Sequence, residues 1–371
     1  MKQNNKNFFL WGAATSSYQV EGGIKNDWTR AGFDSGRAAD HYSRFKEDFD
    51  LAKELGHNAH RFSIEWSRIE PEEGKFDKKE IEHYRKVVTA LQERGLEPFV
   101  TLWHFTNPVW FAESGGFESP KAVFYFERYI NFVTENLKDV KFWITINEPM
   151  VYTKNSYWLG IWPPGRPLSP LSYFRAIKNL IQAHKKASVV IKKVNPRAQV
   201  GIAKNIIYFE EDKHPWHYLQ KLGEYWWNEY FLNKIFDHQD FVGLNYYFHK
   251  HIRRETHPVS DLGWGIYPEG LYQVLGVLKK YNKPIYVTEN GIADAKDEKR
   301  AQFIKDHIDW MKKAMAEGVD VRGYFYWSLL DNFEWEKGFG PRFGLIEVDY
   351  KTMRRKIRGS AYLYKYFIKH S

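Results

Sequence analysis

The chain has 371 residues, of which 43% are hydrophobic, 27% charged and 18% aromatic, and it contains no cysteine. This composition excludes a disordered chain, a collagen-like repeat and a disulfide scaffold, and a chain without cysteine has no thiolate catalysis and no cysteine-ligated metal centre. The net charge is +9, from 55 basic and 46 acidic residues that alternate along most of the chain. We interpret this charge as a solvated surface and expect no nucleic-acid partner.

In chain order, short apolar runs alternate with amphipathic helical segments. The strand candidates are residues 9–15, 58–65, 97–103, 141–147, 200–206, 241–246, 284–288 and 322–328. Between them, residues 40–55 place Phe45 and Phe49 on one helical face before Gly56. A second helical pattern starts at Asp77 and ends before Gly95, and a third covers residues 301–315. We interpret the methionines of these patterns as core residues.

Strands that alternate with helices favour parallel pairing through helical crossovers. Eight such units predict an α/β fold, a single (β/α)₈ barrel in which residues 1–371 form one catalytic domain. No stretch approaches 18 apolar residues, so we expect no membrane span. The N-terminal residues lack the apolar core and cleavage site of a signal peptide, so we expect a cytoplasmic protein.

Two of the predicted strands end in a glutamate. Glu148 follows the fourth strand in Asn147-Glu-Pro, and Glu289 follows the seventh in Thr288-Glu-Asn-Gly. The carboxyl ends of the strands meet at the mouth of a (β/α)₈ barrel, where the chemistry of such barrels takes place. Two carboxyl groups in one cleft are what glycoside hydrolysis requires, one to protonate the leaving oxygen and one to act in its ionised form. Either motif alone is weak evidence, because most of the 46 acidic residues are expected at the surface.

The other strand ends add polar and aromatic side chains. Amides, carboxylates and imidazoles suit the hydroxyl groups at the edge of a sugar ring, and indoles suit its faces. Most of the 66 aromatic residues must nevertheless fill the core. The candidates at the strand ends are Tyr18, Gln19, Arg61, Trp103, His104, Asn245, Tyr246, Tyr247, Trp327, Glu334 and Trp335.

Together these motifs resemble those of glycoside hydrolase family 1, the family of retaining β-glucosidases and β-galactosidases on (β/α)₈ barrels. The resemblance runs from about Phe8 to the C-terminus, in the family's order. The motifs are Tyr18-Gln-Val-Glu-Gly, Arg61-Phe-Ser-Ile, Asn147-Glu-Pro, Leu244-Asn-Tyr-Tyr, Thr288-Glu-Asn-Gly and Trp327-Ser-Leu-Leu-Asp-Asn-Phe-Glu-Trp.

The resemblance implies a role for each matching residue. Glu148 would be the general acid/base and Glu289 the nucleophile of a double displacement on terminal β-D-glucosyl residues, or on galactosyl or fucosyl residues. Arg61 and Tyr247 would orient Glu289, with Asn147 holding the sugar 2-hydroxyl. The substrates would be small β-glycosides or oligosaccharides. The residues implied to bind the sugar or complete the pocket wall are Gln19, His104, Asn245, Trp327, Glu334, Trp335 and Phe343.

One feature of substrate specificity, two departures from the family pattern and two alternative functions accompany this assignment. Glu334 stands in the loop where relatives that act on 6-phosphorylated sugars hold the phosphate, so we expect an unphosphorylated substrate. Met150 replaces a common Trp at a position that we expect to border the leaving group. The chain is shorter than usual, and we place the shortening in residues 28–41 and 209–240, the latter containing Trp216, Trp226 and Trp227. A transglycosylase on the same barrel and a non-catalytic sugar-binding protein remain as alternatives.

We expect neither a metal nor an organic cofactor. The pairs His57/His60 and His214/His217 have i, i+3 spacing, but neither has an obvious third ligand nearby in the sequence, so we assign them structural or surface roles. The Gly-rich segment that starts at Gly338 does not have the spacing of a dinucleotide-binding loop.

Overall fold

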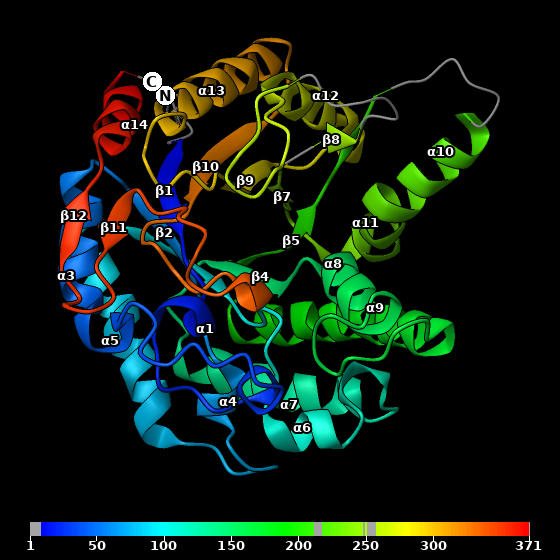
Figure 1. The fold of residues 1–371 in the computed structure, drawn as a ribbon. Coiled ribbons are helices and arrows are strands. Elements are labelled where there is room, and N and C mark those ends of the chain that lie inside the picture. Colours follow the sequence, from blue (N-terminus) through cyan, green and yellow to red (C-terminus); the bar gives the residue numbers. More distant parts are fainter. Residues whose placement is uncertain (1–8, 211–216, 248, 251–256, 371) are drawn as a thin grey trace, which may run out of the picture.

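The computed structural model describes residues 9–210, 217–247, 249–250 and 257–370. In this part of the chain, eight parallel strands close into a barrel in the order β1-β10-β9-β7-β5-β4-β3-β2 (Figure 1). The predicted (β/α)₈ architecture is thereby confirmed, and all eight strand candidates form barrel strands. Their bounds are β1 Leu10–Ala14, β2 Ala59–Ser63, β3 Glu97–Thr101, β4 Phe142–Asn147, β5 Gln199–Asn205, β7 Val242–Asn245, β9 Ile285–Asn290 and β10 Val321–Trp327.

Helices surround the barrel (Figure 1). The long ones are α3 (His41–Glu54), α5 (Lys78–Glu93), α7 (Ala122–Asn136), α9 (Pro170–Val194), α12 (Pro268–Leu278), α13 (Arg300–Ala316) and α14 (Gly359–Lys369). The shorter ones are α1 (Ser17–Val20), α2 (Asp27–Arg30), α4 (Trp66–Ile69), α6 (Val109–Glu113), α8 (Pro149–Thr153), α10 (His217–Glu224) and α11 (Tyr230–Ile235). No helix in the described ranges is long and apolar enough to cross a bilayer.

The three helical patterns of the sequence correspond to α3, α5 and α13. Asp77 caps α5, because its side chain accepts hydrogen bonds from the backbone amides of Lys79 and Glu80. Gly56 and Gly95 follow the ends of α3 and α5 with φ of 80° and 68°, a conformation in which glycine has no side-chain penalty. These local signals explain why the sequence predicts the start of α5 and the ends of α3 and α5.

Two small sheets were not predicted. The strands β6 (Tyr208–Phe209) and β8 (His249–Lys250) pair in parallel, and β11 (Ile346–Val348) pairs antiparallel with β12 (Arg355–Ile357). Strands of two or three residues are too short to show an alternating pattern in the sequence.

The interior of the barrel is packed with aromatic side chains below the site. The Phe99 ring lies 4.3 Å from that of Phe142, 5.1 Å from Tyr286 and 4.8 Å from Phe325, measured between ring centroids. Trp327 belongs to the same buried cluster, at the carboxyl end of β10. Because side chains fill this interior, the barrel is closed below, and the mouth at the strand ends is where a small molecule can bind.

Candidate active site

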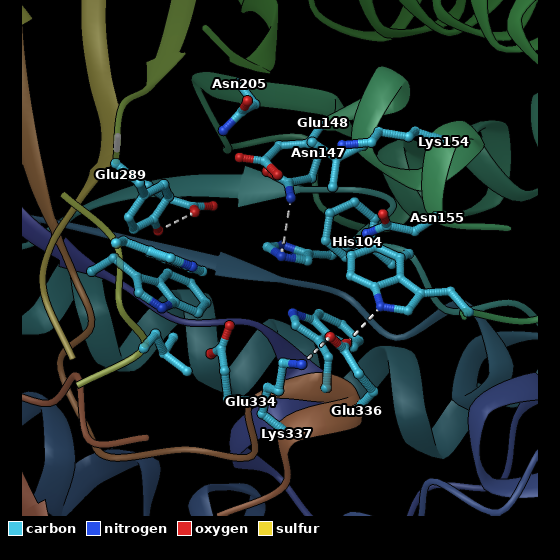
Figure 2. A pocket seen from close by; sticks show the side chains of 18 of the residues that line it. His104, Asn147, Glu148, Lys154, Asn155, Asn205, Glu289, Glu334, Glu336 and Lys337 are labelled. Carbon is cyan, nitrogen blue, oxygen red and sulfur yellow. Dashed lines mark hydrogen bonds and ion pairs between the residues drawn. The ribbon is translucent and has the colours of Figure 1, made fainter. Parts of the chain in front are cut away.

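Glu148 and Glu289 are brought together at the mouth of the barrel. Glu148 directly follows β4 and precedes Pro149, the first residue of α8. Its φ is 41°, a conformation that costs on the order of 1–2 kcal/mol for a residue other than glycine. Glu289 is the second-to-last residue of β9. Both side chains are buried and line one pocket, toward which both turn in Figure 2.

A glycine allows the end of β9 to approach β10. A Cβ atom at Gly291 would lie 1.8 Å from the carbonyl oxygen of Trp327, so every larger residue would collide with the backbone there. The Thr288-Glu-Asn-Gly motif therefore couples the position of Glu289 to that of Trp327.

Two donors hold the Glu289 carboxyl group. Arg61 Nη1 donates to Glu289 Oε1 at 2.5 Å, and the Tyr247 hydroxyl donates to Oε2 at 2.6 Å. Arg61 is itself fully buried on β2 and also donates from Nε to Thr101 Oγ1 at 3.1 Å. A charged donor on one oxygen and a hydroxyl donor on the other fix the orientation of this carboxyl group.

A chain of hydrogen bonds connects the two carboxyl groups. Arg61 Nη2 donates to Asn147 Oδ1 at 2.7 Å, and Asn245 Nδ2 donates to the same oxygen at 3.2 Å. Asn245 Nδ2 also donates to Glu148 Oε1 at 2.8 Å. Residues from β2, β4, β7 and β9 thus form one network, in which displacement of one member would disturb both glutamates.

The environment holds Glu148 in its neutral form. Burial raises the pKa of Glu148 to about 8, and the negative charge of Glu289 adds to the rise, while the hydrogen bond from Asn245 opposes it. Burial also lowers the pKa of Lys204 on β5 to about 7, a shift that Glu148 opposes when it is ionised. The pocket therefore contains one carboxyl group that can donate a proton at neutral pH beside one that is held by cationic and hydroxyl donors.

Further polar and aromatic groups surround the two glutamates. The His104 ring lies 6.0 Å from the Trp327 ring and 5.9 Å from the Trp335 ring between centroids. Burial and the charge of Arg61 hold the pKa of His104 well below its usual value, so this imidazole is neutral. Burial, together with the charge of Glu336, raises the pKa of Glu334 to about 8.

Nine of the twelve residues proposed from the sequence line a cavity of about 240 Å³. These nine are His104, Asn147, Glu148, Tyr247, Glu289, Trp327, Glu334, Trp335 and Phe343. The other three, Gln19, Arg61 and Asn245, lie behind this lining. Gln19 Nε2 donates to Glu334 Oε2 at 3.3 Å, so Gln19 positions a lining residue, and Asn245 is not part of the wall that the resemblance implied.

The sequence did not reveal several residues of the lining. They are Phe105, Val151, Lys154, Asn155, Trp162, Asn205, Ile207, Trp227, Leu262, Trp264, Glu336 and Lys337. Trp162 is held by a hydrogen bond from Nε1 to Glu336 Oε2 at 2.6 Å, and Trp264 packs 5.8 Å from Tyr247 between ring centroids. Most of these residues lie in loops or helices beyond the strand ends, where no periodic pattern marks which way a side chain points.

Met150 does not border the cavity. Its side chain is fully buried in the hydrophobic core and is not among the residues that line the pocket. The expectation that this position contacts a leaving group is wrong, because the first turn of α8 directs Met150 into the protein interior.

The histidine pairs of the sequence do not join the site. His57 and His60 are buried, and His60 Nε2 contacts Thr15 Oγ1 at 3.2 Å. His214 lies outside the described residues. A separate group, which the sequence reasoning missed, is formed by Glu210, His249 and His257, whose ligand atoms lie within 4.8 Å of one another. It does not line the pocket of the two glutamates.

Two buried carboxyl groups that line one pocket at the mouth of a (β/α)₈ barrel are the arrangement that glycoside hydrolysis requires, and the comparison with known families identifies the protein as a glycoside hydrolase. The sequence profile of glycosyl hydrolase family 1 matches residues 1–236 and 217–371, and the chain belongs to this family.

Relatives match over nearly the whole length. The chain is 34% identical to beta-glucosidase A of Thermotoga maritima over 437 aligned positions, which cover 98% of this chain and 97% of that protein. The alignment is longer than the 371 residues of this chain, which is therefore a shortened family member. A beta-glycosidase from Pyrococcus horikoshii superposes with a TM-score of 0.92 at 39% identity, covering 97% and 94% of the two chains. The Thermotoga maritima beta-glucosidase in complex with castanospermine gives 0.91 at 33% identity, covering 97% of each chain.

Proposed function

We propose that this protein hydrolyses terminal, non-reducing β-D-glucosyl residues with retention of configuration, with Glu289 as the nucleophile and Glu148 as the acid/base. The observation that carries the proposal is the asymmetry of the two carboxyl groups. Glu289 accepts hydrogen bonds from Arg61 and Tyr247, whereas burial and the charge of Glu289 raise the pKa of Glu148 to about 8.

The reaction has two displacements. Glu289 attacks the anomeric carbon, the glycosidic C–O bond breaks, and the proton of Glu148 passes to the leaving oxygen. In the second step Glu148 removes a proton from water, the water oxygen attacks the anomeric carbon, and Glu289 leaves as a carboxylate. The sugar emerges with its original anomeric configuration because each step inverts it once.

The sugar contacts follow from the pocket lining. We propose that Asn147 binds the 2-hydroxyl, where hydrogen bonds strengthen in the transition state. His104, Glu334 and Trp335 would bind the other hydroxyl groups, and Gln19, behind the lining, would position Glu334 through its hydrogen bond. Trp327, which closes the barrel interior, would lie under the ring, with Phe343 beside it. We further propose that residues 1–371 act as one catalytic domain in the cytoplasm, which the absence of cysteine fits.

A panel of aryl β-glycosides tests the substrate. We expect the glucoside to be hydrolysed with the highest kcat/KM among glucoside, galactoside, fucoside, mannoside and 6-phosphoglucoside. The phosphorylated sugar should be the poorest, because Lys337 is already paired with Glu336 at 3.5 Å and the phosphate would meet the negative charge of Glu336 in this loop. A preference for the 6-phosphoglucoside would contradict our assignment of Glu334 to a sugar hydroxyl, and inversion of the anomer in the product would contradict the mechanism.

A further inference from the structure

A second cavity adjoins the pocket of the two glutamates. It has a volume of about 740 Å³ and runs between η2 (Lys154–Trp158), α9, α10, η3 (Tyr225–Glu229) and α11. We call it the aromatic groove. Its lining residues are Lys154, Trp158, Tyr173, Phe174, Leu222, Tyr225, Trp226, Trp227, Tyr230 and Lys234.

The aromatic groove is apolar and open to solvent. Phe174 is 53% exposed, Leu222 64% and Trp158 47%. Large apolar side chains gathered in one exposed depression mark a binding surface in soluble proteins, because leaving them in water has no structural benefit. The part of the chain that forms α10 and η3 belongs to the segment in which we placed the shortening, and its Trp226 and Trp227 had no role in the sequence analysis. Trp216 lies outside the described residues.

The aromatic groove shares part of its wall with the catalytic pocket. Lys154 and Trp227 line both cavities. Trp227 forms the shared wall and is fixed from several directions. Its Nε1 donates to Asn205 Oδ1 at 3.3 Å, and the ammonium groups of Lys154 and Lys204 lie 5.4 and 5.3 Å from its ring centroid.

The remaining wall of the aromatic groove is also held in place. Trp226 Nε1 donates to the Tyr173 hydroxyl at 3.0 Å. The Trp226 ring lies 4.4 Å from that of Tyr230 and 5.5 Å from that of Phe174 between centroids. A wall with fixed aromatic rings can bind an apolar chain without paying for its own ordering.

The aromatic groove lies on the leaving-group side of the pocket. Lys154 and Asn155 are the first residues of η2, which comes after Glu148 and α8 in the chain, and Figure 2 places both residues beside Glu148 and away from Glu289. In our mechanism Glu148 protonates the leaving oxygen, so the aglycone must leave the pocket past these residues. Its path then leads over Trp227 into the aromatic groove.

We propose that the aromatic groove binds the apolar aglycone of the substrate, which makes this enzyme selective for β-glycosides with a long alkyl chain or an extended aromatic group. The inference rests on the proposed function. The wall shared with the catalytic pocket at Lys154 and Trp227 favours this occupant over a second copy of the chain or a lipid surface, neither of which would need that shared wall. A methylene group that leaves water completely gains roughly fourfold in binding, and one that is half covered gains about twofold.

The test compares methyl, butyl, hexyl and octyl β-glucosides below their micelle concentrations. We expect kcat/KM to rise about tenfold or more from butyl to octyl, through KM rather than kcat, because the chain contacts the protein equally before and in the transition state. The double variant Phe174→Ser/Leu222→Ser should remove most of this gain and leave methyl β-glucoside unchanged. Its matched control is Phe124→Ser/Val277→Ser, exposed apolar residues that line neither cavity, and this control should keep the gain.

The other possible outcomes contradict either the proposal for the aromatic groove or the proposed function, and the two cases can be told apart. Equal kcat/KM for butyl and octyl glucosides would contradict it, as would an unchanged gain in Phe174→Ser/Leu222→Ser. If that variant instead altered only the mass of the protein in solution, or only its binding to phosphatidylcholine vesicles, the aromatic groove would be an interface between copies or a lipid-binding surface. If no glucoside, methyl included, were hydrolysed, the proposed function would fail. Calorimetric titration with octyl β-glucoside would then still decide whether the groove binds the chain.

Discussion

Replacement of Glu289 by glycine is expected to reduce hydrolysis of aryl β-glucosides by on the order of 10⁴–10⁶-fold, the scale on which an enzyme depends on its nucleophile. The variant removes the carboxylate to which Arg61 and Tyr247 donate, and no covalent intermediate can form. Added azide should restore cleavage of substrates with good leaving groups, because the anion fits the space left by the side chain. The product should be the α-glucosyl azide, since a single displacement inverts the anomeric carbon.

The rescue separates a chemical role from a structural one. A variant that had lost activity through misfolding would not regain it with azide, and circular dichroism should show an unchanged fold. Glu298→Gly, at an exposed acidic residue in the loop before α13, is the matched control and should keep full activity. Full activity of Glu289→Gly, or rescue that yields the β-anomer, would contradict the assignment.

Replacement of Glu148 by alanine is expected to produce a loss that depends on the leaving group. Substrates whose leaving groups need protonation should lose about 10²–10⁴-fold in kcat/KM, the usual contribution of general acid catalysis. Substrates with acidic phenols as leaving groups should lose far less in the first step, because the departing oxygen is stable without a proton. Equal losses for both kinds of substrate, measured over a series of substituted phenyl glucosides, would count against Glu148 as the acid.

The pH dependence gives a second measure of the same role. Glu148 donates a proton, so it acts only in its neutral form, and activity should fall as the pH rises through its pKa of about 8. This alkaline limb should disappear in Glu148→Ala.

The fold could be predicted because each of its units carries a local signal. The eight barrel strands are short apolar runs, and the helices α3 and α5 are bounded by Asp77 or by glycines in the left-handed region. Strands of this kind pair in parallel when helices separate them, so their order around the barrel follows from their order in the chain. The sheets β6/β8 and β11/β12 had no such signal, because they contain only two or three residues per strand.

The centre of the candidate site could be predicted for a related reason. Residues such as Asn147, Glu148 and Glu289 stand at or directly after the last positions of barrel strands, and the fold brings all strand ends to one mouth. The resemblance implied that Arg61 and Tyr247 contact Glu289, and both residues donate hydrogen bonds to Glu289 in the structure. The error at Met150 has the opposite origin, because one residue after a strand the chain turns into α8 and the side chain faces the core.

The outer parts of the pocket could not be read from the sequence. Trp162, Trp227 and Trp264 come from segments far apart in the chain that have no regular period near the pocket. Which of the 15 tryptophans reach the cavity depends on how these segments pack against one another. The aromatic groove is the clearest example, since its two walls come from α9 and from η3, which are separated in the chain by β5, β6 and α10.

The most direct test of the two-carboxylate mechanism is to trap the covalent intermediate. An aryl β-glucoside with fluorine at C2 and an acidic phenol as leaving group should glycosylate the enzyme and then hydrolyse slowly, because the fluorine removes the 2-hydroxyl contact that stabilises both transition states. Mass spectrometry of the digested protein should find one sugar per chain, on the peptide that contains Glu289. A sugar attached to any other residue, or release of the phenol with no attached sugar and an α-configured product, would contradict the double displacement.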